Sequence, residues 1–473
     1  MVWMIRTQED SHGSGKEKRQ QTMSEMLERI LDDANIQTAM QRVKSNGGTF
    51  GVDRMELSKL DDYMKEHLEE IRHEIRTRTF VPNPVRRVEI PKPNGGVRKL
   101  GIPTVVDRTI QQAIVQVLSP ICEPTFSDFS YGFRPGRCCQ QAIIKALEFM
   151  NDGYLWVVDI DLEKFFDNVP QDKLMSYLHR IIDDGDTESL IRRFLKAGVM
   201  VDGTLERTDT GTPQGGNLSP LLSNIMLTEL DRELEARGLH FTRYADDCII
   251  LVRSQAAANR VMHSVTDFIE RKLGLKVNAT KTKTTTPNHL KYLGFGFWRE
   301  KDGTWKARPH EDSKMKFQRK IKQLCRRSWS VELGYRISKL NEVTRGWINY
   351  YRIGGMKKFL AHVSEHLRTM LRIIIWKQWK VPSKRQWGLE KLGIDRDRAR
   401  QTAYMGDHYQ FVCTKLCVKN AISKGKLVRK GLVDPLDYYL GKVGSGVGLN
   451  RPLPNGTMGG VRGDGNGREP SIS

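Results

Sequence analysis

The chain has 473 residues, too many for one ordinary domain, so about two to four domains are expected. Its hydrophobic fraction of 38% can fill real cores and excludes wholesale disorder, and no apolar run approaches the roughly 18 residues of a membrane-spanning helix. The formal net charge of +21 lies in one part of the chain, because residues 1–300 hold 41 Lys and Arg against 42 Asp and Glu, whereas residues 301–473 hold 36 against 14. Such a localised basic region indicates a polyanion as partner, most often a nucleic acid, and a membrane surface is the weaker alternative.

The first 300 residues alternate helix, loop and strand patterns. Residues 1–22 are polar and expected to be flexible, and a helix pattern covers residues 24–43. Residues 45–53 have the composition of a loop, and a charged helix is expected over residues 58–78. Residues 85–103 predict two strands joined by an Asn-Gly-Gly turn, after which helices alternate with short strands.

From residue 310 the pattern becomes helical, with basic residues around apolar stripes. One stripe contains Phe317, Ile321 and Leu324, and a second contains Leu360, Val363, Leu367, Met370, Leu371 and Ile374. Most Trp residues of this region are expected in its core, and they are Trp329, Trp347, Trp376, Trp379 and Trp387. Residues 441–473 contain 10 Gly and no periodicity, which predicts a disordered tail.

The cysteine content and the N-terminus bear on the cellular compartment. Seven cysteines without a CxxC pair disfavour both a disulfide framework and a zinc ribbon, so we interpret all seven as reduced. The N-terminal residues contain no apolar stretch long enough for a secretory signal. A cytosolic protein is therefore expected.

Two acidic clusters stand out because each interrupts a predicted strand. The apolar run Trp156-Val157-Val158 leads into Asp159 and Asp161, and Asp246 and Asp247 lie at the turn of a predicted hairpin. Unpaired carboxylates at a sheet edge are costly unless water or cations solvate them. An Asp-Asp pair alone is more often an ordinary polar turn, but the two clusters together supply hard oxygen ligands suited to Mg²⁺. Two such ions could bind a triphosphate and activate a 3′-hydroxyl for in-line attack.

Phosphoryl transfer also needs cations and backbone donors for the triphosphate. Lys92 and Arg98 flank the turn of the first hairpin and could contact phosphate oxygens from either side, although plain surface charge is the alternative. The loop TPQGGNLSP, residues 212–220, opens a helix with Ser219 as expected N-cap and Pro220 at the first helical position. Such a Gly-rich loop lets the backbone approach a nucleotide closely, or it is an ordinary connector.

Nine short motifs follow one another along the chain. They are, in order, GGTFGVD, RRVEIPKPNGGVRKLGIP, YGFRPGR, VVDIDLEKFFDNV, TPQGGNLSPLLSNI, YADD, GLKVNATKTK, KYLGFGF and TRGWINYYRIG. In this order the chain resembles a bacterial group II intron-encoded protein, a reverse transcriptase and maturase, over about residues 25–440. Retron and diversity-generating enzymes share the YADD turn, but they are not expected to combine TPQGGNLSP with the RGWINYY segment.

The resemblance implies the acid–base and metal-binding residues. It places the ligands of Mg²⁺ at Asp161, Asp246 and Asp247. Asp159, two residues before Asp161 on the same strand face, is an alternative ligand or a neighbour of the site. Lys281 in NATKT matches a candidate general acid for the departing pyrophosphate, with an ordinary surface lysine as the alternative.

The resemblance also implies residues that contact the substrates. Phe166 matches the bulky residue beneath the sugar that excludes a 2′-hydroxyl, whereas Phe165 is expected in the core. Gln214 and Gly215 match the loop beneath the incoming nucleotide and the template. Tyr292-Leu293-Gly294 matches the turn that supports the primer end.

The implied fold is α+β, a right-hand polymerase followed by basic helices. Fingers and palm with an antiparallel sheet are expected over residues 23–300, and a helical thumb and maturase domain over residues 301–390. A basic nucleic-acid-binding extension is expected over residues 391–440. The absence of paired CxxC motifs and of room for an HNH endonuclease domain implies the compact class of the family.

The implied function is RNA-directed DNA synthesis with two Mg²⁺ ions, dNTPs, an RNA template and a DNA primer. The implied partners are the intron RNA, whose splicing and mobility the protein assists, and target DNA, in a cytoplasmic and nucleoid-associated protein. Two alternatives remain, a non-catalytic maturase that only helps its intron to fold and a DNA-templated repair polymerase of the same fold. The intact set of Asp161, Asp246 and Asp247 favours catalysis, because clustered carboxylates are costly unless a cation uses them.

Overall fold

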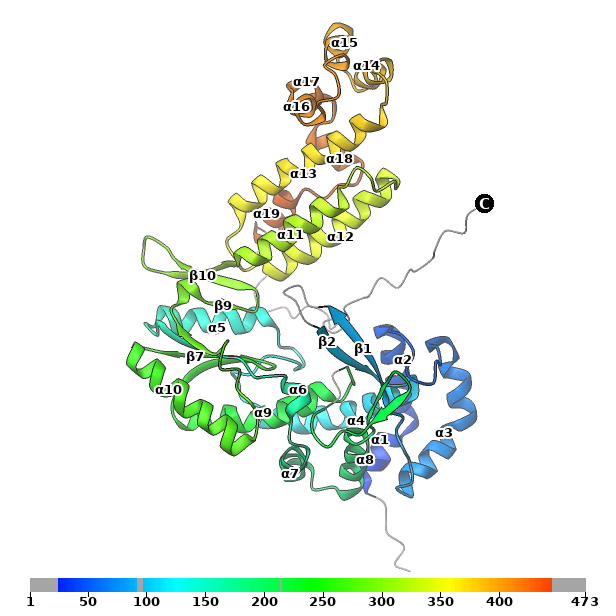
Figure 1. Ribbon diagram of the computed structural model, residues 1–473, viewed down its shortest axis with the longest axis vertical. Coiled ribbons are helices and arrows are strands. Elements are labelled where there is room, and N and C mark those ends of the chain that lie inside the picture. Colours follow the sequence, from blue (N-terminus) through cyan, green and yellow to red (C-terminus); the bar gives the residue numbers. More distant parts are fainter. Residues whose placement is uncertain (1–23, 92–96, 213–214, 445–473) are drawn as a thin grey trace, which may run out of the picture. The chain divides into compact units, whose positions relative to one another are not determined.

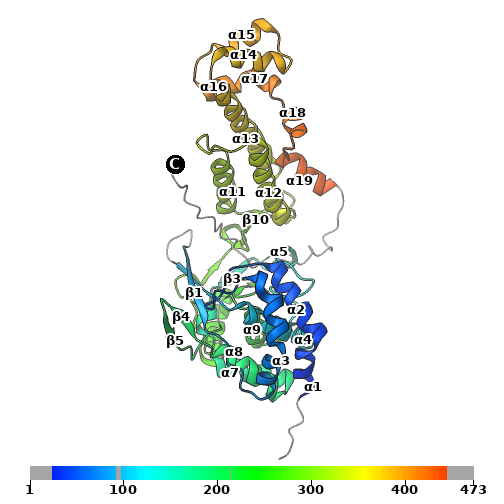
Figure 2. The ribbon, with the colours of Figure 1, turned by 90° about the vertical axis from the view of Figure 1, so that its right-hand side faces the viewer.

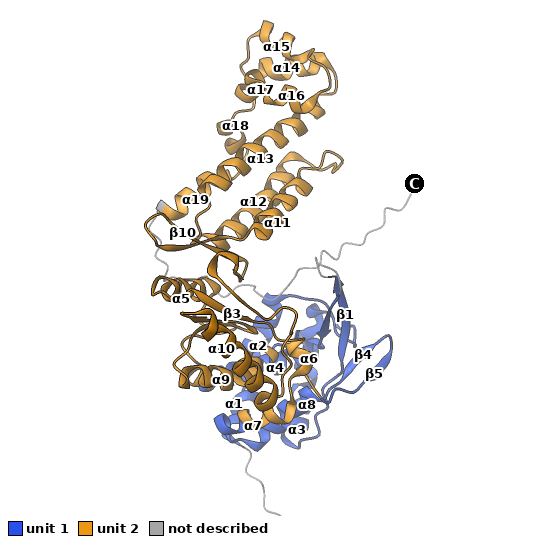
Figure 3. Ribbon diagram, turned by 60° about the vertical axis from the view of Figure 1, so that its left-hand side comes forward, with its two compact units in different colours: residues 1–121, 178–209, 215–218 blue, residues 122–177, 210–214, 219–473 orange. Residues whose placement is uncertain are grey.

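The computed structural model describes residues 24–91, 97–212 and 215–444, which form a mixed α+β fold (Figure 1). Two compact units are distinguished (Figure 3). Unit 1 comprises residues 1–121, 178–209 and 215–218, and unit 2 comprises residues 122–177, 210–214 and 219–473. The expected fold class is confirmed, while the predicted flexible N-terminus and most of the predicted tail lie outside the described residues.

Unit 1 contains a four-stranded sheet and several helices, of which α4 ends one residue into unit 2. The helices are α1 (Glu25–Leu31), α2 (Asp33–Asn46), η1 (Leu57–Lys59), α3 (Leu60–Arg76), α4 (Val105–Cys122) and α8 (Gly185–Leu195). The strands are β1 (Val85–Pro91), β2 (Val97–Ile102), β4 (Val199–Val201) and β5 (Thr204–Glu206), in the order β2-β1-β4-β5. The predicted β1–β2 hairpin is confirmed by antiparallel pairing, and its turn lies outside the described residues.

The single helix predicted over residues 24–43 is wrong, because the structure has two helices that meet at Asp32. The backbone of Asp32 leaves the helical region (φ −58°, ψ 143°), and its carboxylate accepts hydrogen bonds from the N–H groups of Ala34, at 3.0 Å, and Asn35. An aspartate in this position caps a new helix by satisfying backbone donors of its first turn. The buried residues of α1 and α2 would fall on opposite faces of one continuous helix, so the apolar pattern changes phase at the break, a signal that the single-helix prediction overlooked.

Unit 2 is built on a second sheet, in which all strands pair antiparallel, with the strand order β6-β7-β3-β8. Its strands are β3 (Trp156–Ile160), β6 (His240–Tyr244), β7 (Asp247–Val252) and β8 (Lys283–Thr285). Helices α5 (Cys139–Asn151), α9 (Ser219–Ala236) and α10 (Gln255–Asp267) contact this sheet (Figure 1). The remaining helices here are η2 (Glu123–Thr125), α6 (Phe165–Asn168), α7 (Gln171–Ile182, shared with unit 1), η3 (Phe268–Leu273) and η4 (Pro287–His289). Two central strands, β3 and β7, are largely buried, and this sheet carries the acidic residues.

A small third sheet follows in unit 2, with the order β11-β10-β9. It consists of β9 (Lys291–Tyr292), β10 (Phe295–Arg299) and β11 (Trp305–Pro309). Leu293 and Gly294 join β9 to β10 with positive φ angles of 48° and 80°, as the two central residues of a type I′ hairpin turn do. A Cβ atom on Gly294 would lie 2.5 Å from the Tyr351 hydroxyl oxygen, so only glycine fits there.

The C-terminal part of unit 2 is entirely helical in its described residues. It consists of α11 (Glu311–Leu324), α12 (Leu333–Tyr351), α13 (Lys357–Gln378), α14 (Pro382–Lys391), α15 (Arg396–Ala403), α16 (Tyr409–Thr414), α17 (Leu416–Ala421), α18 (Lys424–Arg429) and α19 (Pro435–Gly444). The long helix α13 contacts α16 and α19, and α12 contacts α11 and α19 (Figure 2). Across the described ranges, no helix has the length and apolar content needed to cross a membrane.

The two apolar stripes predicted in this helical part face its core. Phe317 and Ile321 on α11 are buried, as are Leu360, Val363, Leu367, Leu371 and Ile374 on α13. Of the five Trp residues, Trp376 is fully buried and three are half-buried, but Trp387 is 59% exposed. The stripes are therefore confirmed, and Trp387 is the departure from the expected core positions.

A buried polar network ties α13 to the segments that follow it. The Arg372 guanidinium is buried and its Nε donates to the Ile422 carbonyl oxygen at 3.1 Å. The buried Asp434 carboxylate accepts from the Ser364 hydroxyl at 3.1 Å and from the Arg368 guanidinium. Because buried charges are stable only when they are paired, these contacts fix the position of the chain between α17 and α19.

The core position of Leu367 yields a stability prediction. Leu367 is fully buried on α13, whereas Leu416 is 76% exposed at the start of α17. Leu367→Ala should lower the free energy of unfolding by about 2–5 kcal/mol, because it removes buried apolar area and leaves a cavity. Leu416→Ala is the matched control, expected within about 0.5 kcal/mol of the wild type. Denaturant titration checks both, and equal effects would contradict the described core.

Candidate active site

The β6–β7 hairpin presents Asp246 and Asp247 at its tip. Tyr244 pairs with Asp247, which leaves Ala245 and Asp246 as a two-residue loop. Ala245 adopts a positive φ of 57°, as the first loop residue of a primed hairpin turn does. Most residues of the two strands are buried, and β7 is apolar after Asp247, so this strand leads from the acidic turn into the core.

Strand β3 lies beside β7 in the middle of the sheet and ends at the same place. The antiparallel register ends at the pair Ile160 and Cys248. Asp161 and Asp247 are therefore the residues that come next on the two strands. The backbone of Asp161 is held by the loop after η3, because its carbonyl oxygen accepts from the Asn278 N–H at 2.8 Å. The structure therefore brings together the two acidic clusters that lie about 85 residues apart in the sequence.

The electrostatics of this sheet end are those of crowded carboxylates. Burial, followed by the charges of Asp246, Asp159 and Asp161, raises the pKa of Asp247 to about 7. Burial of the carboxyl group is the larger cause of this shift, and the repulsion among the neighbouring carboxylates adds to it. Burial raises the pKa of Asp159 to about 6 in the same way, with Lys283 acting against the shift and Asp161 adding to it. At neutral pH the neighbouring cationic side chains thus do not balance the negative charge of the carboxylates.

Lys281 supplies part of the positive charge beside these carboxylates. Its Nζ atom lies 3.3 Å from both carboxylate oxygens of Asp161, and the Lys281 side chain is 65% exposed. The sequence analysis placed Lys281 and the acids in one site, and the structure puts Lys281 in direct contact with Asp161. Lys283 faces Asp159 across the β3–β8 pairing, a contact that the sequence analysis missed.

The donor set fits a hard divalent cation by its chemistry. Carboxylate oxygens are the ligands that Mg²⁺ prefers, and the repulsion that raises the pKa of Asp247 is what a bound cation would relieve. Among the described residues, however, no three His, Cys, Asp or Glu side chains converge closely enough to hold a metal ion. The structure thus shows the ligand types on one sheet end, without a finished coordination shell.

The segment after β3 places Phe165 and Phe166 differently. Phe165 is buried, as expected for a core residue, and Phe166 is half-buried. The carbonyl oxygen of Phe166 accepts from the Thr212 N–H at 2.7 Å, which joins α6 to the beginning of the Gly-rich loop. Position 211 requires glycine for this contact, because a Cβ atom there would clash with the Phe166 carbonyl oxygen at 2.8 Å.

The remaining predicted substrate residues belong to unit 1 or lie outside the described residues. Arg98 is exposed on β2 opposite Ile90, and Lys92 is outside the described ranges. Gly215 has a φ of 121°, and its Cα is so close to β2 that a Cβ atom would lie 2.5 Å from the Gly101 carbonyl oxygen. Gln214, its neighbour, is outside the described ranges.

The helix after the Gly-rich loop begins one residue earlier than predicted. Helix α9 starts at Ser219 itself, so Ser219 is its first residue rather than its N-cap, and Pro220 is its second. Proline is tolerated in the first turn because the N–H group that it lacks has no helical acceptor there.

Sequence reasoning also missed a fully buried ion pair beneath the acidic hairpin. Arg243, directly before Tyr244, and Asp231 on α9 both have 0% side-chain exposure, with Arg243 Nε 2.7 Å from Asp231 Oδ1. An arginine inside a predicted strand was the available signal, because a buried charge requires a partner.

Comparison with known protein families assigns both parts of the chain. Residues 90–297 match the reverse transcriptase (RNA-dependent DNA polymerase) family, and residues 314–393 match the maturase-specific domain of group II introns. Protein YkfC of Escherichia coli (strain K12) is 34% identical over 273 residues, which cover 50% of this chain and 72% of YkfC. The chain belongs to the group II intron-encoded reverse transcriptases and maturases.

This group II intron-encoded protein matches only part of the length of two further relatives. The group II intron-encoded protein LtrA of Lactococcus lactis subsp. cremoris is 40% identical over 190 residues, which cover 40% of this chain and 32% of LtrA. The putative COX1/OXI3 intron 2 protein of Saccharomyces cerevisiae is 27% identical over 350 residues, covering 61% of this chain and 40% of that protein. The match thus spans about a third of LtrA's length and less than half of the yeast protein's.

The raised pKa of Asp247 predicts a pH-dependent stability effect. The folded state holds this proton more tightly than the unfolded chain, whose aspartates titrate near 3.8, so stability is lost as the pH rises from about 4 to 7 and the full cost is present above pH 7. In metal-free buffer, Asp247→Asn should therefore raise the free energy of unfolding at pH 8, by about 1 kcal/mol after solvent screening. Near pH 4 the gain should vanish, because wild-type Asp247 is then protonated in the folded protein.

Asp152→Asn, at the exposed end of α5, is the control for this measurement. Its effect on the free energy of unfolding should be small, because this side chain is exposed. A pH-independent effect of Asp247→Asn would contradict the described crowding of carboxylates.

Proposed function

We propose that this protein is an RNA-directed DNA polymerase that also binds its intron RNA and assists splicing and mobility. The observation that carries the proposal is the gathering of Asp159, Asp161, Asp246 and Asp247 with Lys281 at one sheet end. Crowded carboxylates destabilise a fold unless they serve a cation. The reverse transcriptase domain around them and the maturase-specific domain after them support the same function.

Asp161, Asp246 and Asp247 are the residues that would hold two Mg²⁺ ions. When bound there, such ions supply Lewis-acid activation of a primer 3′-hydroxyl and stabilise charge on the dNTP phosphates. The exposed Lys281 ammonium group, in contact with Asp161, is placed to give a proton to the departing pyrophosphate. Burial raises the pKa of Asp159, and Lys283 is its neighbour, which favours Asp161 as the direct ligand.

Other residues would orient the substrates. The partly exposed Phe166 ring, beside the acidic sheet end, would lie beneath the deoxyribose and exclude a 2′-hydroxyl. Arg98 on β2 would contact the triphosphate together with Lys92, and Gly215 would let the backbone approach the nucleotide together with Gln214.

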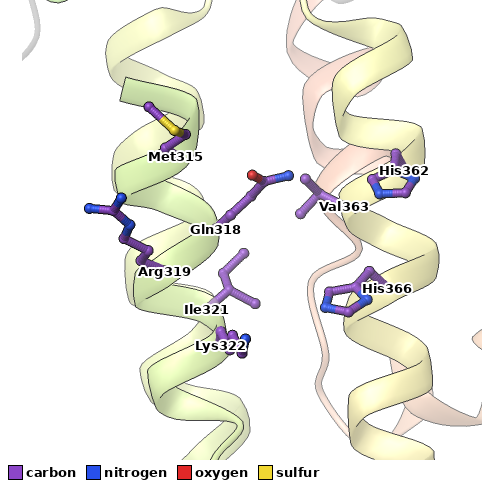
Figure 4. Close-up of a pocket in the computed structure, with 8 residues that line it drawn as sticks. All are labelled: Met315, Gln318, Arg319, Ile321, Lys322, His362, Val363 and His366. Carbon is purple, nitrogen blue, oxygen red and sulfur yellow. The ribbon is translucent and has the colours of Figure 1, made fainter. Parts of the chain in front are cut away.

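The basic helices would bind the intron RNA. Residues 310–440 contain 29 Lys and Arg against 11 Asp and Glu. A groove of about 300 Å³ between α11 and α13 is lined by Arg319, Lys322, His362 and His366, among others (Figure 4). Arg319 and Lys322 make the α11 wall positive, and the two histidines of the α13 wall offer ring nitrogens as hydrogen-bond donors. Such a wall suits the phosphates of a structured RNA, which proteins recognise mainly by shape and backbone. Target DNA would use the same kind of contact.

Removal of one carboxylate tests the catalytic proposal. Asp246→Ala should lower primer extension on an RNA template at least about 1000-fold, because the remaining acids cannot hold the reacting oxygens in line. Intron-RNA affinity, measured by filter binding, should stay at the wild-type value, since the basic helices are unchanged. Comparison of Asp159→Asn with Asp161→Asn identifies the ligand of that pair, and the greater loss is expected for Asp161→Asn.

Three outcomes separate the alternatives. Wild-type extension by Asp246→Ala would contradict the acidic site. A wild-type protein that binds intron RNA but extends no primer would be the non-catalytic maturase. Extension on DNA templates but not on RNA templates would indicate a repair polymerase.

Neutralisation of α11 tests the RNA-binding surface. Lys316, Arg319 and Lys320 are exposed on α11, and their replacement by Gln leaves the apolar stripe intact. The slope of log affinity for intron RNA against log salt should become shallower by about 0.7–0.9 for each phosphate that the helix no longer neutralises. Arg326 of the same basic run is unsuited to this variant, because α11 ends at Leu324.

The matched control neutralises three exposed basic residues elsewhere in unit 2, Arg260, Arg271 and Lys272. Both variants lose the same charge, so general electrostatics affect them equally. Circular dichroism verifies folding. Equal slopes for the two variants would mean that the α11 charges only solvate the helix.

A further inference from the structure

The tip of the acidic hairpin rests on residues that cannot touch a substrate. Arg243, the fourth residue of β6, has 0% side-chain exposure, and so does its partner Asp231 on α9. Besides its two contacts with Asp231, at 2.7 and 2.5 Å, the Arg243 guanidinium donates through Nη1 to the carbonyl oxygen of Ala245 at 2.9 Å. One buried cation therefore links α9 to the loop residue that directly precedes Asp246.

Asn224 adds a second link from the same helix. Its side-chain oxygen accepts from Arg243 Nη1 at 3.2 Å, and its side-chain nitrogen donates to the Gly132 carbonyl oxygen at 2.9 Å. Asn224 and Asp231 are seven residues apart on α9, two helical turns, so they project from one face. Asn224 is 1% exposed, and this network is closed to solvent.

Gly132, from the motif YGFRPGR, closes the other side of the hairpin tip. The residues before it run beside β6, with the Tyr131 N–H donating to the Arg243 carbonyl oxygen at 2.9 Å. A Cβ atom on Gly132 would lie 2.3 Å from the Ala245 backbone nitrogen and 2.9 Å from the Tyr244 carbonyl carbon. The φ of Gly132 is not positive, so the glycine is required by this close approach and not by its own backbone conformation.

We propose that Gly132, Asn224, Asp231 and Arg243 are positioning residues that hold the Ala245 peptide and thereby fix where the Asp246 and Asp247 carboxylates point. The inference rests on the function proposed above. Ala245 needs such support because a non-glycine residue at a φ of 57° is intrinsically unfavourable and persists only where its surroundings hold it. The YGFRPGR motif then has a role in the reaction without contacting the substrate.

The experiment compares full-length variants that add or remove one small group. Gly132→Ala inserts a methyl group against the Ala245 peptide, and Asn224→Ala removes the link between Gly132 and Arg243. Gly185→Ala, at the start of α8, is the matched control, because its nearest neighbour is the Arg78 guanidinium at 4.0 Å. The measurements are kcat and KM for dNTP, primer–template affinity, Mn²⁺ binding by electron paramagnetic resonance, and thermal unfolding.

For a positioning role, kcat should fall about 100-fold in Gly132→Ala and about 10-fold in Asn224→Ala, since displacements of about 1 Å at reacting groups have such effects. Mn²⁺ affinity of the free protein should fall as well. KM for dNTP and primer–template affinity should remain within about twofold of wild type, as should all values for Gly185→Ala. A purely structural role would lower the unfolding temperature without this split between kcat and KM.

A folded Gly132→Ala protein with wild-type kcat and Mn²⁺ affinity would overturn the inference. If Gly132→Ala does not fold, Asn224→Ala decides, because wild-type kcat in that variant overturns the inference and a reduced kcat with unchanged KM supports it. Asp246→Ala serves as the reference. Wild-type extension by Asp246→Ala would overturn the proposed site and this inference with it, whereas an inactive Asp246→Ala beside fully active Gly132→Ala and Asn224→Ala would overturn the positioning role alone.

Discussion

Repulsion among four aspartates at the end of one sheet is the constraint on which the palm of this protein depends. Asp159 and Asp161 lie at the end of β3, and Asp246 and Asp247 lie at the turn beside it. Burial and the charges of the neighbouring carboxylates together raise the pKa of Asp247 to about 7. A fold selected for stability alone would avoid this arrangement, so its presence points to the chemistry that the carboxylates serve.

The surrounding structure answers this constraint in two ways. Cationic side chains reduce the repulsion directly, with Lys281 3.3 Å from the Asp161 carboxylate and Lys283 opposite Asp159. Rigid packing answers it indirectly, because the buried pair of Arg243 and Asp231 resists any outward relaxation of the hairpin. Strain at the functional end is therefore balanced by a satisfied polar network one layer below it.

The basic helices α11 and α13 follow a different principle, in which most charged side chains lie apart from the apolar stripe that fills the core. Apolar stripes on α11 and α13 fill the core, and the fully buried Trp376 belongs to it. Most Lys and Arg residues between the stripes lie at the surface, where like charges are tolerated at low cost and can neutralise phosphates, whereas Arg372 is buried and paired. The exposed Trp387, with the Lys391 Nζ 4.7 Å from its ring centroid, lies outside this scheme.

Local pattern and composition were sufficient for the elements of this protein and for the residues with reactive chemistry. Apolar residues around the acidic clusters located β3, β6 and β7, and helical periodicity located α11 and α13. The ordered motifs identified the family. Each of these signals is carried by neighbouring residues. The sequence analysis missed two local features, the helix break made by the capping side chain of Asp32 and the first residue of α9. Only the tertiary structure showed how Lys281, Lys283, Arg243 and Gly132 surround the acids. Those contacts join segments up to about 120 residues apart, and a single sequence carries no record of which distant charge or glycine completes which site.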